Sequence, residues 1–445
     1  MEYPERIEGL ENTINRFARY KTEMGSVGVK EIIGEIKQFL LERTAELEML
    51  PEDPHRAGEP SELEAIRAAA PSEKVEFCRI LSDEDYIRKL RGAINGRFAG
   101  CALGAPVELL TIEELEAFAT AIDAPFPPQN YWPDAPMPFR PRYKVGKARD
   151  FTVPHMRALP PDDDIIYTFL ALLTLEQFGP QFTTENIAEL WQKYLPVECT
   201  FTAERITLNN LRSGIPADKA GAVRNSDTEL IGAAIRCDGW AFVNPLNPER
   251  ASEYAHRDAY LSHRKSGIYS AMYFAAVIAS AFGTDSVEEA LEIGLQYVPT
   301  DCEFSRQVRW ALAIAPEITD YKKANQAVSK RFPGMDPVHT INNACLTVWG
   351  IIIGKNDFSK GISETVAMAY DNDCTAATVG SVLGAFLGID RIPDFWYVPW
   401  NNTAISYLNG IDRFDIEDTV YRFYAIKRSL DSDGVDPEKQ LWPTT

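Results

Sequence analysis

One long apolar segment near the C-terminal end organises the hydrophobic pattern of this chain. Residues 376–388 contain no charged side chain, so the pattern predicts a helix that is buried on most sides. Its glycines recur at every fourth residue, on one face where a second backbone can approach closely: Gly380, Gly384 and Gly388. Asp371 and Asp373 stand directly before it, where the positive end of a helix stabilises negative charge. Taken alone, a turn with an N-cap explains these acids equally well.

A second apolar segment is built in the same way. Asp162, Asp163 and Asp164 precede residues 165–173, which again contain no charged side chain. Three adjacent carboxylates exceed what one helix cap can use, because a cap satisfies only a few backbone N–H groups. Oxygen ligands from two helix starts are what Mg²⁺, Mn²⁺ or Ca²⁺ prefer. The two clusters together therefore predict a metal site.

A third segment carries a stripe of small residues. Glycines stand four apart on one predicted helix face: Gly92, Gly96, Gly100 and Gly104. Such a helix can pack tightly against another, and Pro106 ends it. Glu108 follows just past that end, close to whatever the helix contacts. No strand precedes this segment, so its glycine pattern does not indicate a dinucleotide-binding fold.

The remaining periodicity is helical and predicts an all-α fold. We expect one large domain over residues 86–445, preceded by a helical extension over residues 1–85. In this extension the apolar residues fall on one helical face, first from Ile7 to Phe17 and then from Ile32 to Leu40. It contains no concentrated chemistry, so we expect it to serve packing or oligomerisation, with the oligomeric state left open.

Charge and cysteine content narrow the class of protein. The net charge of −20 argues against a nucleic-acid or anionic-membrane partner, because phosphates repel such a surface. Seven dispersed cysteines without a CxxC pair indicate free thiols in a reducing compartment. The N-terminus shows no secretory signal pattern, and the longest apolar run, residues 271–282, is too short to span a membrane. We therefore expect a cytoplasmic protein.

A proline-rich loop separates the glycine-rich segment that ends near Pro106 from the first acidic cluster at Asp162. Ten of the 29 prolines lie between Ala124 and Pro161, so regular structure cannot persist there. Among them is a basic island that includes Arg140, Arg142 and Lys144. A solvated charge run and an anion-binding wall for phosphate groups explain this island equally well.

Nucleophilic catalysis has no strong candidate in the sequence. No Ser-His-Asp arrangement stands out, and the anions around Cys374 would raise the pKa of its thiol and weaken it as a nucleophile. His263 and His339 each stand near a predicted helix start, where a histidine more often caps the helix or packs in the core. Metal-assisted or acid–base chemistry is therefore favoured.

Taken in order, these segments resemble the ADP-ribosylglycohydrolase family, of the dinitrogenase-reductase-activating glycohydrolase type. The G-D-A-L-G-x-P-x-E motif of the family is matched by residues 100–108. Its T-D-D-T motif is matched by residues 162–165, and its D-x-D-T motif by residues 371–374. The resemblance extends from about Ala93 to Gly388.

The resemblance implies an all-helical fold with two divalent ions, usually Mg²⁺ with Mn²⁺ possible, between the acidic clusters. Four carboxylates match metal ligands of the family: Asp163, Asp164, Asp371 and Asp373. Asp162 replaces a liganding threonine and can still supply oxygen. Cys374 replaces a second one, for which the hydroxyl of Thr375 is a substitute, because thiols are poor partners for Mg²⁺. Cys101 and Ile165 also depart from the family motifs, which have an aspartate and a threonine there.

Catalytic roles follow from the same resemblance. Glu108 matches an acid near the bound ribose, and either Asp163 or Glu108 can deprotonate the attacking water. The carboxylates would also stabilise an oxocarbenium-like transition state at the anomeric carbon.

Three functions remain open at this point. The first is a metal-dependent glycohydrolase that cleaves the bond between ADP-ribose and an acceptor, either a protein side chain or a small molecule. The second is a hydrolase of a smaller N-riboside, and the third is a catalytically silent ADP-ribose-binding or structural homologue. The basic island favours the first, because a diphosphate needs cationic partners, whereas the departures at residues 162 and 374 favour the others.

Overall fold

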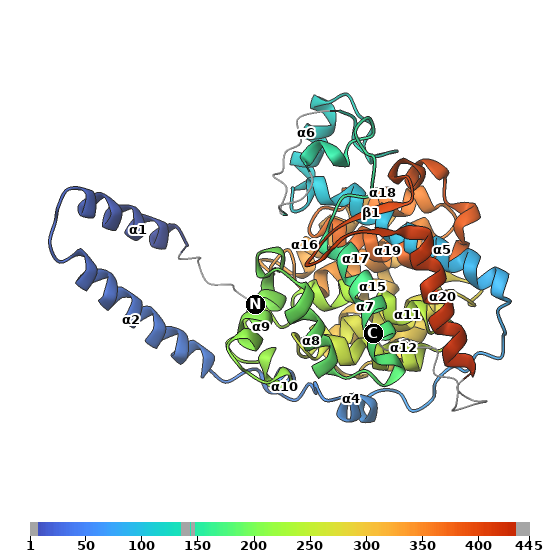
Figure 1. Ribbon diagram of the computed structural model, residues 1–445, viewed down its shortest axis with the longest axis horizontal. Coiled ribbons are helices and arrows are strands. Elements are labelled where there is room, and N and C mark those ends of the chain that lie inside the picture. The colour runs from blue at the N-terminus through green and yellow to red at the C-terminus, as the bar shows by residue number, and fades with distance from the viewer. Residues whose placement is uncertain (1–7, 135–142, 144–146, 433–445) are drawn as a thin grey trace. The chain divides into compact units, whose positions relative to one another are not determined.

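The computed structural model describes residues 8–134, 143 and 147–432. The described residues up to Glu59, together with Pro333–Met335, form one compact unit, and the others form a second. Helices build both units (Figure 1), which confirms the predicted all-α class.

The helices of the first unit are α1 (Glu8–Glu23), α2 (Val29–Glu48) and α3 (Pro54–Ala57). Those of the second unit are α4 (Leu63–Ala69), α5 (Asp83–Gly104), α6 (Ile112–Ala121), α7 (Asp163–Phe178), α8 (Thr184–Tyr194), α9 (Thr202–Arg212), α10 (Ala217–Ala220), α11 (Asp238–Phe242), α12 (Pro248–Ala259), α13 (Ser266–Ala281), α14 (Val287–Gly294), α15 (Glu303–Ile314), α16 (Tyr321–Arg331), α17 (Thr340–Gly354), α18 (Phe358–Ala367), α19 (Asn372–Leu387) and α20 (Ile416–Ser432). Short 3-10 segments join them, at η1 (Ala105–Val107), η2 (Ala148–Phe151), η3 (Gly179–Gln181), η4 (Val197–Cys199), η5 (Ile231–Arg236), η6 (Leu295–Tyr297), η7 (Ala315–Glu317), η8 (Ile389–Arg391), η9 (Asp394–Trp396) and η10 (Val398–Trp400).

The core of the second unit surrounds α13. Every residue of this helix is buried, as its nearly continuous apolar sequence predicts. Helices α12, α14, α17 and α19 pack against it, together with η5. This core fixes the position of α19, whose first turn carries the second acidic cluster.

The predicted glycine stripes meet each other. Helices α5 and α19 contact along their length, because neither has side chains that keep the backbones apart. A Cβ atom added to Gly96 would lie 2.2 Å from the carbonyl oxygen of Gly380, and one added to Gly92 would lie 2.5 Å from that of Gly384. Gly388 ends α19 with a φ of 80°, and its carbonyl carbon would lie 2.9 Å from a Cβ atom added to Gly92. The close contact aligns the end of α5 with the start of α19.

Filling this contact is expected to unfold or strongly destabilise the protein. A Cβ atom at Gly100 would lie 2.0 Å from the carbonyl oxygen of Ala376, and backbone cannot move aside as a side chain does. We expect Gly100→Ala to lower the free energy of unfolding by about 3 kcal/mol or more, as severe overpacking does. Urea unfolding measures this. The matched control is Gly34→Ala in α2, where an added Cβ meets nothing within 4 Å, and which should be neutral or slightly stabilising.

The sequence pattern missed one element, a β-hairpin in the second unit. Strands β1 (Thr403–Leu408) and β2 (Ile411–Asp415) pair antiparallel around Asn409 and Gly410, which has a φ of 79°. An Asn-Gly pair between two strands is a common signal for a tight hairpin turn. The strands are short and only partly alternating, so the surrounding helical pattern concealed them.

Candidate metal centre

The first acidic cluster forms the start of α7. Asp162 is the N-cap residue, and its carboxylate accepts a hydrogen bond from the backbone N–H of Asp164 at 3.2 Å. Only one of the three acids makes this capping bond, as the sequence predicts. Asp164 is fully buried and Asp163 is half-buried, so the cluster runs from the protein interior toward the surface.

The second acidic cluster follows a strained turn before α19. Ala369 and Tyr370 both have positive φ, at 67° and 62°, although neither is glycine. Such strain persists only where the surrounding structure holds it, and it often marks functional sites. The carbonyl of Tyr370 accepts a hydrogen bond from the backbone N–H of Leu109 at 3.1 Å. This bond places Glu108 beside the start of α19.

Asp371 occupies the N-cap position of α19, but its side chain does not cap the helix. Its backbone carbonyl accepts hydrogen bonds from the N–H and the hydroxyl of Thr375, each at 3.0 Å. Its carboxylate oxygen Oδ1 is buried and has no hydrogen-bond partner among the described residues. A cation or a proton can compensate a buried carboxylate oxygen that has no donor, because burial of an uncompensated charge is costly.

The two clusters converge into overlapping groups of ligand atoms, each group spanning no more than 4.8 Å. The groups are Asp162, Asp163 and Asp164; Asp164, Asp373 and Cys374; and Glu108, Asp371 and Asp373. Gly104 is the reason for this convergence, since its missing side chain lets α5 approach the backbone of Asp373. Residues about 200 positions apart thus face one another, and their hard oxygen donors suit Mg²⁺ or Mn²⁺.

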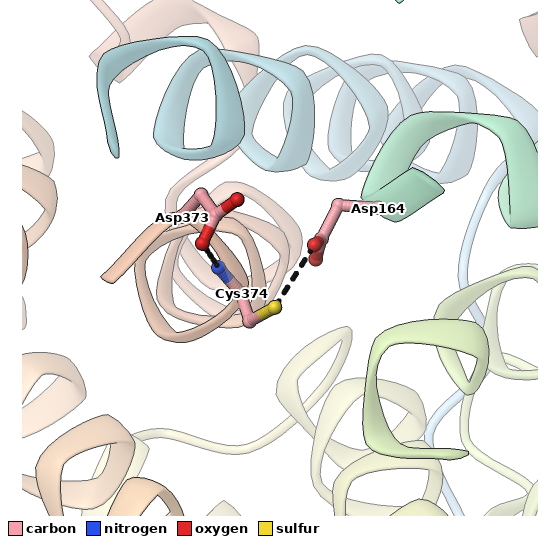
Figure 2. A group of neighbouring side chains, drawn as sticks. All are labelled: Asp164, Asp373 and Cys374. Atoms are coloured by element: carbon pink, nitrogen blue, oxygen red, sulfur yellow. Dashed lines mark hydrogen bonds between the residues drawn. The ribbon is translucent and has the colours of Figure 1, made fainter. Parts of the chain in front are cut away.

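Figure 2 shows the middle group, where α7 and α19 meet. The thiol of Cys374 donates to Oδ2 of Asp164 at 3.1 Å, and the backbone N–H of Cys374 donates to Oδ1 of Asp373 at 3.0 Å. Burial raises the pKa of the Cys374 thiol well above its usual range, and the surrounding carboxylates raise it further. Cys374 therefore acts here as a neutral hydrogen-bond donor and not as a nucleophile.

A buried arginine that the sequence analysis missed holds Asp164 in place. Arg97 of α5 donates from Nη2 to Oδ1 of Asp164 and from Nε to its backbone carbonyl, both at 2.8 Å. Its Nε also lies 3.1 Å from Oδ2 of Asp238, which accepts a second hydrogen bond from Thr168 at 2.9 Å. One guanidinium thus faces two buried carboxylates. The sequence could have indicated this role, because Arg97 is the one charged residue of the glycine-rich stretch 92–104.

The electrostatics of the metal-free site favour protonated acids. Burial raises the pKa of Asp164 to about 8, although Arg97 acts to lower it. Burial also raises the pKa of Asp371 well above its usual range, and the neighbouring Asp373 and Glu108 add to the effect. These carboxylates fit a divalent cation, because the ion would supply the positive charge that burial withholds.

The stability of the metal-free protein is therefore expected to fall as pH rises. The folded protein keeps the proton on Asp164 up to about pH 8, whereas the unfolded chain loses it near pH 4. Between these values the folded state binds more protons, so the free energy of unfolding decreases with pH. Mg²⁺ favours the ionised carboxylates, so its stabilising effect should grow over the same range. Melting temperatures at pH 5 and pH 8, in EDTA and in Mg²⁺, measure this difference. Parallel pH profiles in the two media would contradict it.

A second missed residue, Tyr143, orients Asp163. The Tyr143 hydroxyl donates to Oδ1 of Asp163 at 2.8 Å and accepts the backbone N–H of Asp163 at 2.9 Å. The ring of Tyr143 stacks on Tyr407 of β1, with ring centroids 4.7 Å apart. The proline-rich loop thus reaches the start of α7 through one aromatic side chain. In the sequence, only the position of Tyr143 beside the basic island pointed to a role at this site.

The structure brings six predicted site residues to this place: Glu108, Asp162, Asp163, Asp164, Asp371 and Asp373. Thr375 lies one turn into α19, where its hydroxyl donates to the backbone carbonyl of Asp371. The predicted diphosphate contacts Arg140, Arg142 and Lys144 lie outside the described residues. His339 caps α17 as expected, since its Nδ1 accepts the backbone N–H of Ile341 at 3.1 Å. His263 is fully buried, in line with a core histidine.

Within the described part of the chain, no helix combines the length and the apolar character needed to cross a membrane.

Comparisons with known proteins bear on this site. The sequence model of the ADP-ribosylglycohydrolase family matches residues 82–424. An uncharacterized protein of Archaeoglobus fulgidus is 27% identical over 320 residues, which cover 69% of this chain and 90% of that protein. A solved structure described as an ADP-ribosylglycohydrolase-related protein complex has a TM-score of 0.51 and 18% identity, and the match covers 78% of this chain and 99% of that chain. That structural likeness shows the fold. Because the family match covers most of the chain, including both acidic clusters, this protein belongs to the ADP-ribosylglycohydrolase family.

Proposed function

We propose that this protein is a divalent-metal-dependent glycohydrolase that cleaves the bond between ADP-ribose and an acceptor, either a protein side chain or a small molecule. Family membership supports a hydrolase that acts on ADP-ribosyl linkages. The observation that carries the metal dependence is the convergence of buried carboxylates from two helix starts, one of which keeps an oxygen without a hydrogen-bond donor.

The proposed metal ligands are oxygen donors of the two clusters: Asp162, Asp163, Asp164, Asp371, Asp373 and Thr375. When bound, Mg²⁺ or Mn²⁺ would orient ribose hydroxyls and lower the pKa of a water molecule. Cys374 is not among the proposed ligands, because a neutral thiol is a poor partner for Mg²⁺. Its hydrogen bond to Asp164 instead fixes the orientation of that carboxylate.

Asp163 and Glu108 are the proposed acid–base residues. Tyr143 holds one oxygen of Asp163, so the other oxygen is oriented to accept a proton from the attacking water. Glu108 lies in the group with Asp371 and Asp373, at the end of η1. Negative charge at this place would stabilise the positive charge that develops on the anomeric carbon.

A substrate panel tests this proposal. The full-length protein is incubated with a peptide ADP-ribosylated on arginine, one ADP-ribosylated on serine, and a nucleoside without a diphosphate. Released sugar or ADP-ribose is measured by chromatography in Mg²⁺, in Mn²⁺ and in EDTA. We expect ADP-ribose release from at least one peptide, and its loss in EDTA. Turnover of the nucleoside alone would replace the proposal by the smaller N-riboside hydrolase, and binding without turnover by the silent homologue.

The basic island provides a test of the diphosphate. Replacing Arg140, Arg142 and Lys144 with alanine should weaken ADP-ribose binding and spare ribose, since charge-assisted hydrogen bonds contribute roughly 1.5–3 kcal/mol each. Each such contact corresponds to about tenfold or more in affinity. Calorimetric titration measures this. The matched control makes the same charge change at exposed positions elsewhere in the second unit: Lys323→Ala, Lys330→Ala and Arg391→Ala. Equal ADP-ribose affinity in both triple variants would remove the basic island from the substrate site.

A further inference from the structure

The first unit exposes an unusual amount of apolar surface. Among the described residues, twelve of the twenty exposed large apolar side chains lie between Leu10 and Leu50. Phe17 and Phe39 are 64% and 57% exposed. Patches of this kind on a folded protein mark interaction sites, because water disfavours contiguous apolar surface. This segment lies outside residues 82–424, which match the family, so it is not part of the proposed catalytic site.

Helices α1 and α2 form a hairpin whose mutual contact uses only part of this surface (Figure 1). The half-buried apolar positions, on the sides where the helices meet, are Ile14, Ala18, Val29, Ile33 and Ile36. Apolar side chains continue around each helix, at Leu10 and Phe17 on α1, with Met24 just past its end, and at Ile32 and Phe39 on α2. At 100° per residue, both series lie on the same open face of the antiparallel hairpin. The hairpin therefore resembles half of a four-helix bundle.

The open face also contains a hollow of about 330 Å³ on α1. Thr13, Arg16, Phe17 and Tyr20 line it, and it is wide enough to receive an apolar side chain of another helix. Its lining combines two aromatic side chains with a threonine and an arginine. Such a hollow suits the knob-into-hole packing of helix bundles.

Opposite charges border the two sides of this face. Arg16 stands four residues before Tyr20, so it borders the apolar stripe on α1. On α2, Glu35 lies between Ile32 and Phe39 on the same side, and Glu42 follows one turn later. The edge formed by α1 is therefore basic around Arg16, with Glu23 two turns further along it, and the edge formed by α2 is acidic.

We propose that a second copy of this chain covers the hairpin, so that two hairpins form an antiparallel four-helix bundle. A two-fold axis parallel to the helices places α1 of each copy over α2 of the other and pairs each basic edge with an acidic one. With Tyr20 of the hollow, six exposed side chains lie on this face: Leu10, Phe17, Tyr20, Met24, Ile32 and Phe39. Together they would bury roughly 600 Å² per copy, close to the ~800 Å² per partner of a standard interface. The face is thus self-complementary in shape and charge, as a two-fold interface requires.

Sedimentation velocity of the full-length protein tests the association. We expect a dimer at micromolar concentration, and at least a tenfold higher dissociation constant for Phe17→Glu combined with Phe39→Glu. Both side chains are exposed in the single chain, so circular dichroism should show unchanged helix content. The matched control, Ile80→Glu, adds a carboxylate at an apolar side chain that is 93% exposed in the second unit and should leave the dimer intact. A monomeric wild-type protein, or equal effects of the variant and the control, would overturn the proposal.

Charge reversal tests the identity and orientation of the partner. Arg16→Glu makes both edges acidic, and Glu35→Lys with Glu42→Lys makes both basic, so each variant alone should dissociate at least tenfold more readily. Mixing the two should restore a heterodimer, because every edge then faces the opposite charge. Lys37→Glu is the control, since positions two apart on a helix do not share a face. If the mixture stays monomeric while each variant is folded, another partner or another geometry covers the hairpin, and the proposal fails.

Discussion

Asp373→Asn is expected to abolish metal-dependent turnover while leaving the protein folded. Asp373 belongs to two of the three groups of ligand atoms, so its charge acts on both sides of the site. The amide keeps the shape of the side chain but removes one anionic ligand. Changes to residues that only support a metal ligand typically cost 10- to 100-fold in affinity or activity, and we expect a loss of about 100-fold or more for a direct ligand.

The same variant has an informative effect on the metal-free protein. Asp373 is one of the neighbours that raise the pKa of Asp164 and of Asp371, so removing its charge relieves repulsion. The melting temperature in EDTA should therefore stay equal or rise, while the stabilisation by Mg²⁺ shrinks. Calorimetric titration with Mg²⁺ and thermal melts measure both effects. The control Asp285→Asn, at a side chain that is 99% exposed, should change neither. A loss of stability in EDTA with Mg²⁺ affinity unchanged would show that Asp373 has a structural role instead.

Arg97→Met is expected to have a large effect on stability. Methionine fills a similar volume but leaves the carboxylates of Asp164 and Asp238 buried without their shared guanidinium. Breaking a buried ion pair typically costs 3–5 kcal/mol, so we expect a decrease of about that size in the free energy of unfolding above pH 8, where Asp164 is ionised. The decrease should be smaller at lower pH, where Asp164 keeps its proton. Urea unfolding in EDTA measures it without a contribution from metal binding.

Two further variants distinguish charge from packing in this prediction. Adding Asp238→Asn to Arg97→Met removes one of the two uncompensated charges and should recover part of the loss, which lost packing alone would not allow. Arg91→Met in the same helix breaks a partly exposed pair with Glu417 and should cost less than about 1 kcal/mol. Equal losses for Arg97→Met and Arg91→Met would show that the buried guanidinium is not essential to the folded site.

The hydrogen bonds of Asp164 show what Cys374 contributes to the site. The thiol donates a hydrogen bond to Asp164, as a threonine hydroxyl at this position could also do. Arg97 and Cys374 therefore orient the same carboxylate from two sides. The change at residue 374 preserves a donor to Asp164 while it removes a hard oxygen from the site.

The sequence by itself was sufficient to predict the features that depend on residues close together along the chain. Glycines four residues apart predicted two helices that pack closely, and Gly96 against Gly380 is such a contact. Acids before apolar segments predicted the starts of α7 and α19, because the positive N-terminal end of a helix stabilises carboxylates. The resemblance to the family motifs predicted that these two helix starts lie close together around a metal site.

Only the tertiary structure decided which partners meet across the chain. Arg97 reaches Asp164 and Asp238 from α5 because the glycine contacts fix the position of that helix, and no local pattern encodes the distance. Tyr143 reaches Asp163 from an irregular loop, where periodicity carries no information. The unpartnered oxygen of Asp371 likewise results from the strained turn and the packing around it. Burial sets the charge state of these acids, and burial is a property of the assembled fold.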